Sequence, residues 1–229
     1  MVEKRWLSKS QINTFLQCPR KWKYIYEDGI SSIPSSQMLR GTKIHKKVEE
    51  FYKNVNIKDN KVISNDVDLK KFVDFENQRL KDCPDMKYYK PVFQELRVVN
   101  EELGLRGIID AIFINPKDGQ LIIIDWKTGQ AKNNIDEYRL ELAIYKILFE
   151  NDKHINKVEG LNVGYWGIFF LDKGKLLFEP VNDKYVQKAI KIINKVRLDI
   201  EKKDYKMKPS FWCRYCQFKD KCGGNNVNI

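Results

Sequence analysis

The middle of the chain contains two β-rich runs, each with one aspartate among isoleucines. The runs are Leu105–Asn115 and Gln120–Trp126, and the turn sequence Pro-Lys-Asp-Gly separates them. If these four residues form the loop of an antiparallel hairpin, Asp110 lies directly opposite Asp125, with Cβ atoms about 5 Å apart. Both faces of the hairpin are largely apolar, which is typical of a central sheet covered by helices on both sides. The pattern therefore predicts an α/β fold.

The two aspartates predict a metal site. Carboxylates placed close together in apolar surroundings repel one another and lose hydration, and a divalent cation between Asp110 and Asp125 offsets both costs. Lys127 follows Asp125 by two residues, so both lie on one face of a strand, where the ammonium can hold a water or a phosphate oxygen beside the metal. The alternative is that both aspartates are solvated at strand ends, because a one-residue slip of the hairpin would turn the faces over.

The rest of the chain reads as one domain, residues 1–229, built around this hairpin. Further strands are predicted at Val92–Asn100, Val163–Leu171 and Leu176–Val181. Helices are predicted within 7–27 and at Thr42–Lys53, Ile135–Glu150 and Lys184–Lys203. The domain then divides into an N-terminal helix (7–27), a helical insertion (55–90, with a weak helical pattern around Leu69–Leu80), a core (92–181) and a cysteine-rich end (205–222).

The net charge and the hydropathy of the chain indicate which classes of partner to expect. The formal net charge of +11 suggests a polyanionic partner such as DNA, although a lysine-rich solvated surface would give the same excess. No apolar run approaches the roughly 20 residues that span a bilayer, and the first residues lack the apolar core of a secretory signal. We therefore expect a cytoplasmic protein with no membrane partner.

The cysteines indicate a second metal centre. An odd count of five in a chain of this kind argues against a disulfide framework. Cys213, Cys216 and Cys222 lie within ten residues, Cys18 offers a fourth thiol, and Cys83 stands apart. Four thiolates suit either Zn²⁺ or an iron–sulfur cluster, and the spacing alone does not separate the two.

Several motifs resemble those of the RecB-like branch of the PD-(D/E)XK nucleases. Gly107-Ile-Ile-Asp110 followed by Asp125-Trp-Lys127-Thr-Gly129 resembles the G-x-x-D and D-x-K-T-G motifs of that branch, and Gly41-Thr-Lys-Ile-His45 resembles its G-x-x-x-H. The resemblance implies a restriction-endonuclease-like core, in which a mixed sheet is flanked by helices. It also implies that Asp110, Asp125 and His45 bind Mg²⁺ or Mn²⁺ and that Lys127 assists the attacking water.

A further motif of the branch, Q-x-x-x-Y, is associated with positioning DNA. Glu141-Leu-Ala-Ile-Tyr145 resembles it, with glutamate in place of glutamine, and the spacing puts Glu141 and Tyr145 on one helix face. Tyr145 could equally be a core residue. Glu95, on the first predicted strand, is a further acidic candidate at the edge of the site.

The N-terminal segment resembles the opening of the iron–sulfur RecB-like nucleases. These include CRISPR-associated adaptation nucleases and the AddB-type helicase–nuclease subunit, and the similarity lies in Leu7-Ser-Lys-Ser through Cys18-Pro-Arg-Lys. The resemblance implies a structural [4Fe–4S] cluster held by Cys18, Cys213, Cys216 and Cys222. Aromatic neighbours such as Trp22 and Trp212 are candidates either to stack the bases of a single strand or to pack around the cluster.

These expectations combine into a Mg²⁺- or Mn²⁺-dependent deoxyribonuclease. From the resemblance, single-stranded DNA cut from a free end is the expected substrate. The alternative is a subunit of a CRISPR-adaptation or recombination complex that binds and processes DNA ends, with an adaptation protein or a helicase as partner. A zinc-stapled DNA-binding protein without activity is a third hypothesis, which the complete acidic pair and lysine argue against.

Overall fold

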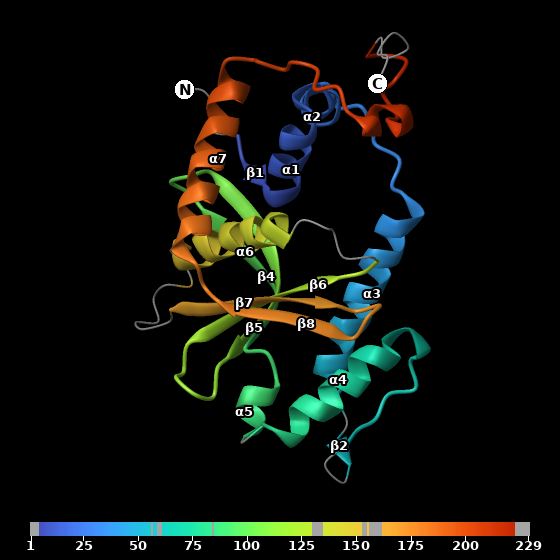
Figure 1. Cartoon of the computed structure of the whole chain (residues 1–229), viewed down its shortest axis with the longest axis vertical. Helices are drawn as coiled ribbons and strands as arrows, with labels where there is room; N and C mark the ends of the chain where they lie inside the picture. The colour runs from blue at the N-terminus through green and yellow to red at the C-terminus, as the bar shows by residue number, and fades with distance from the viewer. Residues whose placement is uncertain are drawn as a thin grey trace.

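A mixed six-stranded sheet lies at the centre of the computed structural model (Figure 1), which describes residues 5–55, 57–58, 61–83, 85–129, 135–152, 155 and 162–222. The strand order is β1-β5-β6-β7-β8, with β4 also paired to β5. The β1–β5 and β6–β7 pairs are parallel and the other pairs antiparallel. The strands are β1 (Leu7–Ser8), β4 (Phe93–Asn100), β5 (Leu105–Ile114), β6 (Leu121–Lys127), β7 (Val163–Phe170) and β8 (Lys175–Pro180).

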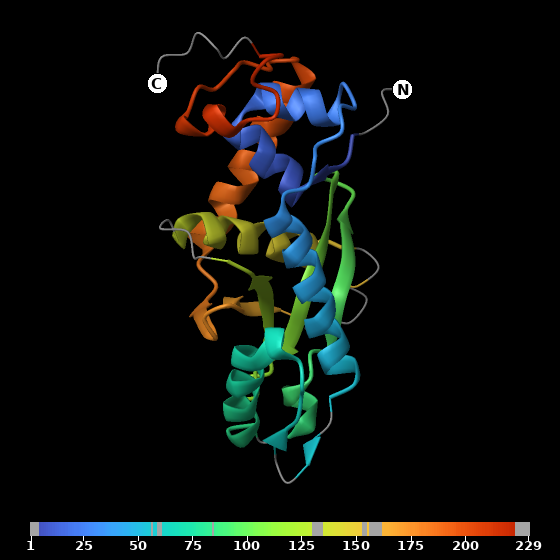
Figure 2. The same ribbon diagram turned by 90° about the vertical axis from the view of Figure 1, so that its right-hand side faces the viewer.

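Helices cover both faces of this sheet, as its apolar faces predict (Figures 1 and 2). The larger core contains Ile112 and Ile123 of the sheet, and the smaller contains Ala111 and Ile124, so neighbouring residues of β5 and β6 serve opposite faces. The first core is closed by α1 (Lys9–Gln17), α2 (Pro19–Tyr26), α6 (Ile135–Glu150) and α7 (Asp183–Glu201). The second is closed by α3 (Ser36–Lys53), α4 (Lys70–Lys81) and α5 (Met86–Tyr89). In the described residues no helix is long and apolar enough to cross a membrane.

The hairpin of β5 and β6 has the predicted register. Ala111 pairs with Ile124 and Ile114 with Leu121, and the Asn115 amide donates to the Gln120 carbonyl at 2.8 Å. Continuing this register sets Asp110 opposite Asp125. Gly119 closes the turn with φ +74°, a conformation that glycine adopts without strain.

The N-terminal segment is not the single helix that we expected. Residues Leu7–Ser8 form β1, and the helix is broken into α1 and α2. The Ser8 hydroxyl accepts the Gln11 amide at 3.2 Å and caps α1. The break lies at Cys18, which is extended (φ −161°, ψ 111°) because the following Pro19 disfavours the helical conformation in the residue before it.

Two other boundaries differ from expectation. Helix α3 begins at Ser36 and not at the predicted residue 42. Its first turns are exposed and carry no apolar periodicity, so hydrophobic spacing does not indicate the earlier start. The Ser35 hydroxyl caps it by accepting the Met38 amide at 3.2 Å. The insertion contains, besides α4 and α5, a small hairpin of β2 (Ile57–Lys58) and β3 (Lys61–Val62) and a 3₁₀ turn, η1 (Val67–Leu69), which we did not predict.

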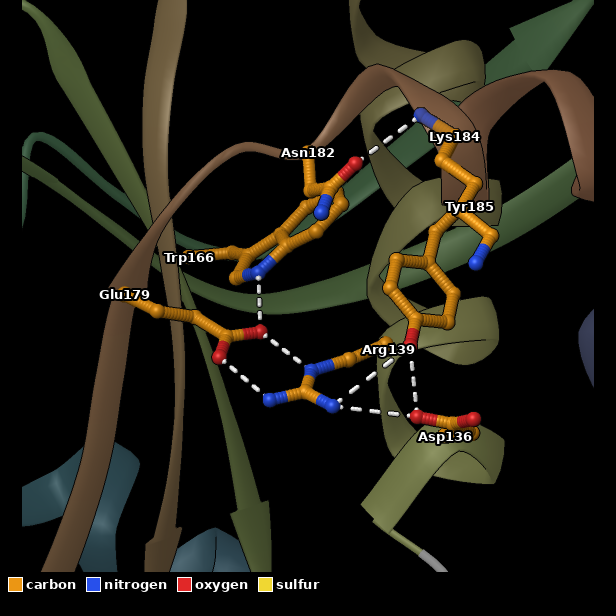
Figure 3. A network of polar contacts seen from close by, with 7 residues as sticks. All are labelled: Asp136, Arg139, Trp166, Glu179, Asn182, Lys184 and Tyr185. Carbon is orange, nitrogen blue, oxygen red and sulfur yellow. Dashed lines mark hydrogen bonds and ion pairs between the residues drawn. The ribbon is translucent and has the colours of Figure 1, made fainter.

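An ion-pair network fixes α6 against β8 and the start of α7 (Figure 3). The Arg139 guanidinium makes two 2.8 Å bonds to the Glu179 carboxylate of β8 and one of 3.0 Å to Asp136. The Tyr185 hydroxyl of α7 donates to Asp136 at 2.5 Å, and the Trp166 indole donates to Glu179 at 3.0 Å. The network anchors the helix that carries Glu141 and Tyr145.

Candidate functional site

Three predicted polar residues from three elements converge at the sheet. His45 of α3, Glu95 of β4 and Asp110 of β5 each offer a ligand atom, and these atoms all lie within 4.8 Å of one another. His45 Nδ1 is 3.6 Å from Asp110 Oδ2, which also accepts the Trp126 amide at 2.8 Å. Within the described part of the chain, this is the only such group of histidine, cysteine and acidic side chains. The group has the composition of a divalent-cation site.

Local packing explains why His45 reaches the sheet. Its neighbours Ile44 and Val48 are buried in the second core, which fixes the rotation of α3. One turn earlier, a Cβ at Gly41 would lie 3.3 Å from the Thr128 hydroxyl, just beyond β6. A larger side chain there would press α3 away from the end of β6, so the glycine of the G-x-x-x-H motif permits the close approach.

Glu95 is held in an unusual backbone conformation. Its φ of 46° lies in the left-handed region, which a non-glycine residue occupies at a cost of about 1–3 kcal/mol. The flanking pairs Gln94–Ala111 and Leu96–Ile109 place Glu95 opposite Asp110. Strain at this position coincides with the clustering of its carboxylate beside His45. The sequence identified Glu95 only as an acidic candidate, because nothing in its local pattern indicates positive φ.

The carboxylates shift the titration of these ligand groups. Burial lowers the pKa of His45, but the hydrogen bond and charge of Asp110, assisted by Asp125 and Glu95, raise it above its usual value. Burial, followed by the charge of Asp110, raises the pKa of Glu95. The carboxylate contributions to both shifts show negative charge gathered at the group, which a cation would relieve.

Asp125 and Lys127 lie beside this group on β6 and share a face, as their spacing predicts. Lys127 Nζ is 2.6 Å from Asp125 Oδ2 and 2.9 Å from Glu141 Oε2 of α6. Burial raises the pKa of Asp125, but the attraction of Lys9 and Lys127 outweighs it and brings the pKa to about 2. Burial lowers the pKa of Lys127, and Asp125 more than reverses this. Asp125 is thus ionised and held by ammonium groups, and it lies outside the three-residue group.

Glu141 and Tyr145 share a helix face but are only 6% and 5% exposed. Glu141 contacts the site lysines, and its Oε1 accepts the Asn13 amide of α1 at 3.1 Å. Burial raises the pKa of Glu141, whereas Lys9 and Lys127 lower it and give a net decrease. The two residues therefore face the site from within the core.

Lys9 is a site residue that the sequence analysis missed. Its Nζ lies 3.0 Å from Asp125 Oδ1, 3.4 Å from Glu141 Oε2 and 4.3 Å from the centroid of the Tyr145 ring. Burial lowers the pKa of Lys9, but Asp125 and Glu141 raise it well above its usual value. The one available signal was a lysine in the first turn of a helix, where positive charge is disfavoured.

The four predicted ligand cysteines come together at one end of the molecule, although almost the whole chain separates Cys18 from the others. They line a cavity of about 470 Å³ between α1, α2 and η2 (Phe211–Tyr215). Burial, followed by the neighbouring thiols, raises the pKa of Cys222, while Arg20 lowers it. The Tyr24 ring packs 5.3 Å from that of Phe218, and its hydroxyl donates to the Lys221 carbonyl at 3.3 Å. Both views show α2 and the C-terminal segment that contains η2 side by side (Figures 1 and 2).

Two aromatic residues near the cysteines have different environments. Trp22 is 0% exposed and packs between Phe15, Tyr26 and Tyr205, so it belongs to the core and cannot line a DNA path. Trp212, by contrast, is 63% exposed, and Phe211 and Tyr215 beside it are also exposed.

Comparisons with known proteins identify a family for this chain and solved structures of similar fold. The family model for the PD-(D/E)XK nuclease superfamily matches residues 6–223. Among solved structures, a candidate exonuclease from Eubacterium rectale superposes with a TM-score of 0.58 at 14% identity, covering 99% of this chain and 90% of the other. The protein SSO0001 superposes with a TM-score of 0.52 at 17% identity, with the same coverage of each chain. No curated protein matches by sequence. The family match spans nearly the whole chain, and on that ground the chain belongs to the PD-(D/E)XK nuclease superfamily.

Proposed function

We propose that the protein is a metal-dependent deoxyribonuclease that cuts single-stranded DNA from a free end. The observation that carries the proposal is the adjacency of two groups of polar side chains at the sheet. His45, Glu95 and Asp110 offer ligand atoms within 4.8 Å of one another, and Asp125 and Lys127 lie beside them on β6. One group suits a cation, and the other supplies the acidic residue and lysine that the superfamily motif contains.

His45, Glu95, Asp110 and Asp125 would hold a Mg²⁺ or Mn²⁺ ion, which would supply Lewis-acid activation of water and neutralise charge on the phosphate. The chain's own residues then orient the reaction. Lys127 extends from the same face as Asp125 and holds the attacking water or a phosphate oxygen. Glu141 fixes that ammonium at 2.9 Å from the interior side, so we assign Glu141 and Tyr145 a positioning role in place of direct DNA contact.

We also propose that Cys18, Cys213, Cys216 and Cys222 hold a [4Fe–4S] cluster with a structural role. All four line one cavity and none forms a disulfide. The choice of iron–sulfur over zinc rests on the resemblance of the segment from Leu7 to Cys18 to the opening of the iron–sulfur RecB-like nucleases.

The preference for a single strand is supported by the surface near the cysteines. Phe211, Trp212 and Tyr215 are exposed, and bases stack on such rings without sequence preference. The net charge of +11 favours a polyanion. This surface could also receive a protein of an adaptation or helicase complex, and DNA binding by the isolated chain separates the two uses.

The test uses protein purified anaerobically and DNA labelled at either the 5′ or the 3′ end. We expect degradation of single strands with Mn²⁺ or Mg²⁺, none with EDTA, and slower degradation of blunt duplex. Mononucleotide or short products from one end establish exonuclease action and its polarity. A folded, cluster-containing protein that binds DNA without cutting it would instead favour a DNA-end binding module. Absorbance near about 400 nm distinguishes iron–sulfur from zinc.

A further inference from the structure

Lys9 closes a ring of alternating charges in the candidate active site. Its Nζ is 3.0 Å from Asp125 Oδ1 and 3.4 Å from Glu141 Oε2. On the other side of the ring, Lys127 Nζ is 2.6 Å from Asp125 Oδ2 and 2.9 Å from Glu141 Oε2. Two ammonium groups thus balance two carboxylates, and both oxygens of Asp125 are engaged by lysines.

The position of Lys9 is unfavourable for the helix that carries it. Lys9 is the first residue of α1, whose first turn has no acidic residue, and the helix dipole disfavours positive charge there. Its side chain is only 17% exposed, although lysine is rarely buried unless it is paired. The face of the Tyr145 ring, 4.3 Å away, gives it a further favourable contact. Contacts in the candidate active site, and not the stability of α1, therefore account for a lysine at this position.

The α1 helix is held in place without Lys9. Leu7 of β1 pairs with Leu105 of β5, and the Ser8 hydroxyl caps the helix. Ile12 and Phe15 are buried in the larger core. The Lys9 side chain can thus leave Asp125 while the helix stays where it is.

We propose that Lys9 is a displaceable counter-ion, which holds the Asp125 carboxylate in the metal-free protein and releases it when a divalent cation binds. This inference rests on the proposed function, because it assigns Asp125 to the metal. A divalent cation at Asp125 would be close to both ammonium groups, and like charges at such separations repel strongly. Lys9 and Lys127 have equally flexible side chains, but the proposed function keeps Lys127 beside the metal, where it holds the attacking water or a phosphate oxygen. Lys9 is therefore the lysine that moves, and its ammonium is then available to a phosphate oxygen of DNA.

The test is calorimetric titration of Mn²⁺ into metal-free protein, without DNA. Lys9→Met removes the competing charge, so we expect Mn²⁺ to bind at least about tenfold more tightly than to the parent. Lys9→Arg keeps the charge and should bind Mn²⁺ like the parent. Lys195→Met is the matched control, because Lys195 also pairs with an aspartate, Asp199 at 3.0 Å on α7, but its side chain is exposed. Mn²⁺ binding by Lys9→Met that is equal to or weaker than that of the parent overturns the proposal.

Two further results decide the case if Lys9→Met is poorly folded without metal. Circular dichroism should then show that Mn²⁺ restores its structure, and failure to do so counts against a displaceable counter-ion. The double variant Lys9→Met/Glu141→Gln removes one charge of each sign and should bind Mn²⁺ about as the parent does. Binding as tight as that of Lys9→Met alone would refute charge balance as the cause. Cleavage of DNA by the parent, measured in parallel, tests the nuclease proposal separately, and the Mn²⁺ titration decides on Lys9 whichever way it turns out.

Discussion

Replacing Asp125 by asparagine measures what the buried charge ring contributes to stability. The pKa of Asp125 is about 2, because the attraction of Lys9 and Lys127 outweighs the effect of burial. An aspartate in the unfolded chain has a pKa near about 3.9, and a difference of nearly two units corresponds to roughly 2–3 kcal/mol. Asparagine keeps the size but leaves two ammonium groups with Glu141 alone in the ring. We therefore expect Asp125→Asn to lower the free energy of unfolding at pH 7 by about 3 kcal/mol.

The pH dependence of this loss has a definite sign. The folded pKa of Asp125 lies below the unfolded value, so the stabilisation is fully present above about pH 4 to 5 and is lost as the pH falls towards 2. The stability difference between parent and variant should therefore shrink over the same range.

Equilibrium urea denaturation in EDTA, followed by tryptophan fluorescence between pH 7 and pH 3, provides the assay. Asp74→Asn is the matched control, because Asp74 pairs with Lys70 on the exposed surface of α4, where such pairs contribute little. The reasoning is refuted if Asp125→Asn is as stable as the parent at pH 7, or if its destabilisation is the same at pH 3.

Other predictions concern the scaffold, the cysteines and the histidine. Arg139→Met loses the paired bonds to Glu179 and should lower the free energy of unfolding by about 1–3 kcal/mol, more than Arg139→Lys does. Thermal or urea denaturation measures this, and an unchanged stability would contradict the anchoring role of this network. Gly167→Ala should destabilise the fold by roughly 1–3 kcal/mol, because the new Cβ would lie 2.8 Å from the Leu177 carbonyl oxygen of the neighbouring strand; a neutral effect would show that the β7–β8 pair adjusts freely. Cys18→Ser should lower both iron content and protease resistance, whereas Cys83→Ser should change neither; equal effects of the two would argue against the four-cysteine centre. Mn²⁺ affinity should rise with pH through the pKa of His45, which Asp110 raises above its usual value, because only the neutral imidazole binds metal. An affinity that does not change with pH would exclude His45 as a ligand.

The hairpin shows how far short-range patterns determine this fold. Four turn residues and two β-rich runs are enough to place Asp110 opposite Asp125 and Lys127 beside it, because the period of a strand leaves little freedom. Apolar residues and good helix formers agree in predicting a helix over Ile135–Glu150, and α6 has these bounds. Apolar spacing alone predicts one N-terminal helix, whereas the proline after Cys18 divides it into α1 and α2.

The rest of the site depends on contacts between residues that are far apart in the sequence, and hydrophobic periodicity does not predict these contacts. Glu95 joins His45 and Asp110 through a left-handed backbone conformation within a strand, which no local pattern indicates. Lys9 meets Asp125 across 116 positions of sequence, and the pairing of β1 with β5 and the burial of α1 in the larger core bring them together. Glu141 differs from the glutamine of the related motif, and the two lysines that balance its charge explain how a carboxylate is accommodated there.

The proposed function makes the group containing Asp110 the metal centre of a nuclease. The most direct measurement is the rate of cleavage of end-labelled single-stranded DNA at saturating Mn²⁺, comparing the parent with Asp110→Asn and with Asp74→Asn as control. We predict that Asp110→Asn lowers the rate by at least about 100-fold while Asp74→Asn leaves it unchanged. If a folded Asp110→Asn protein cleaves DNA within a few-fold of the parent rate, the catalytic centre lies elsewhere and the account is wrong.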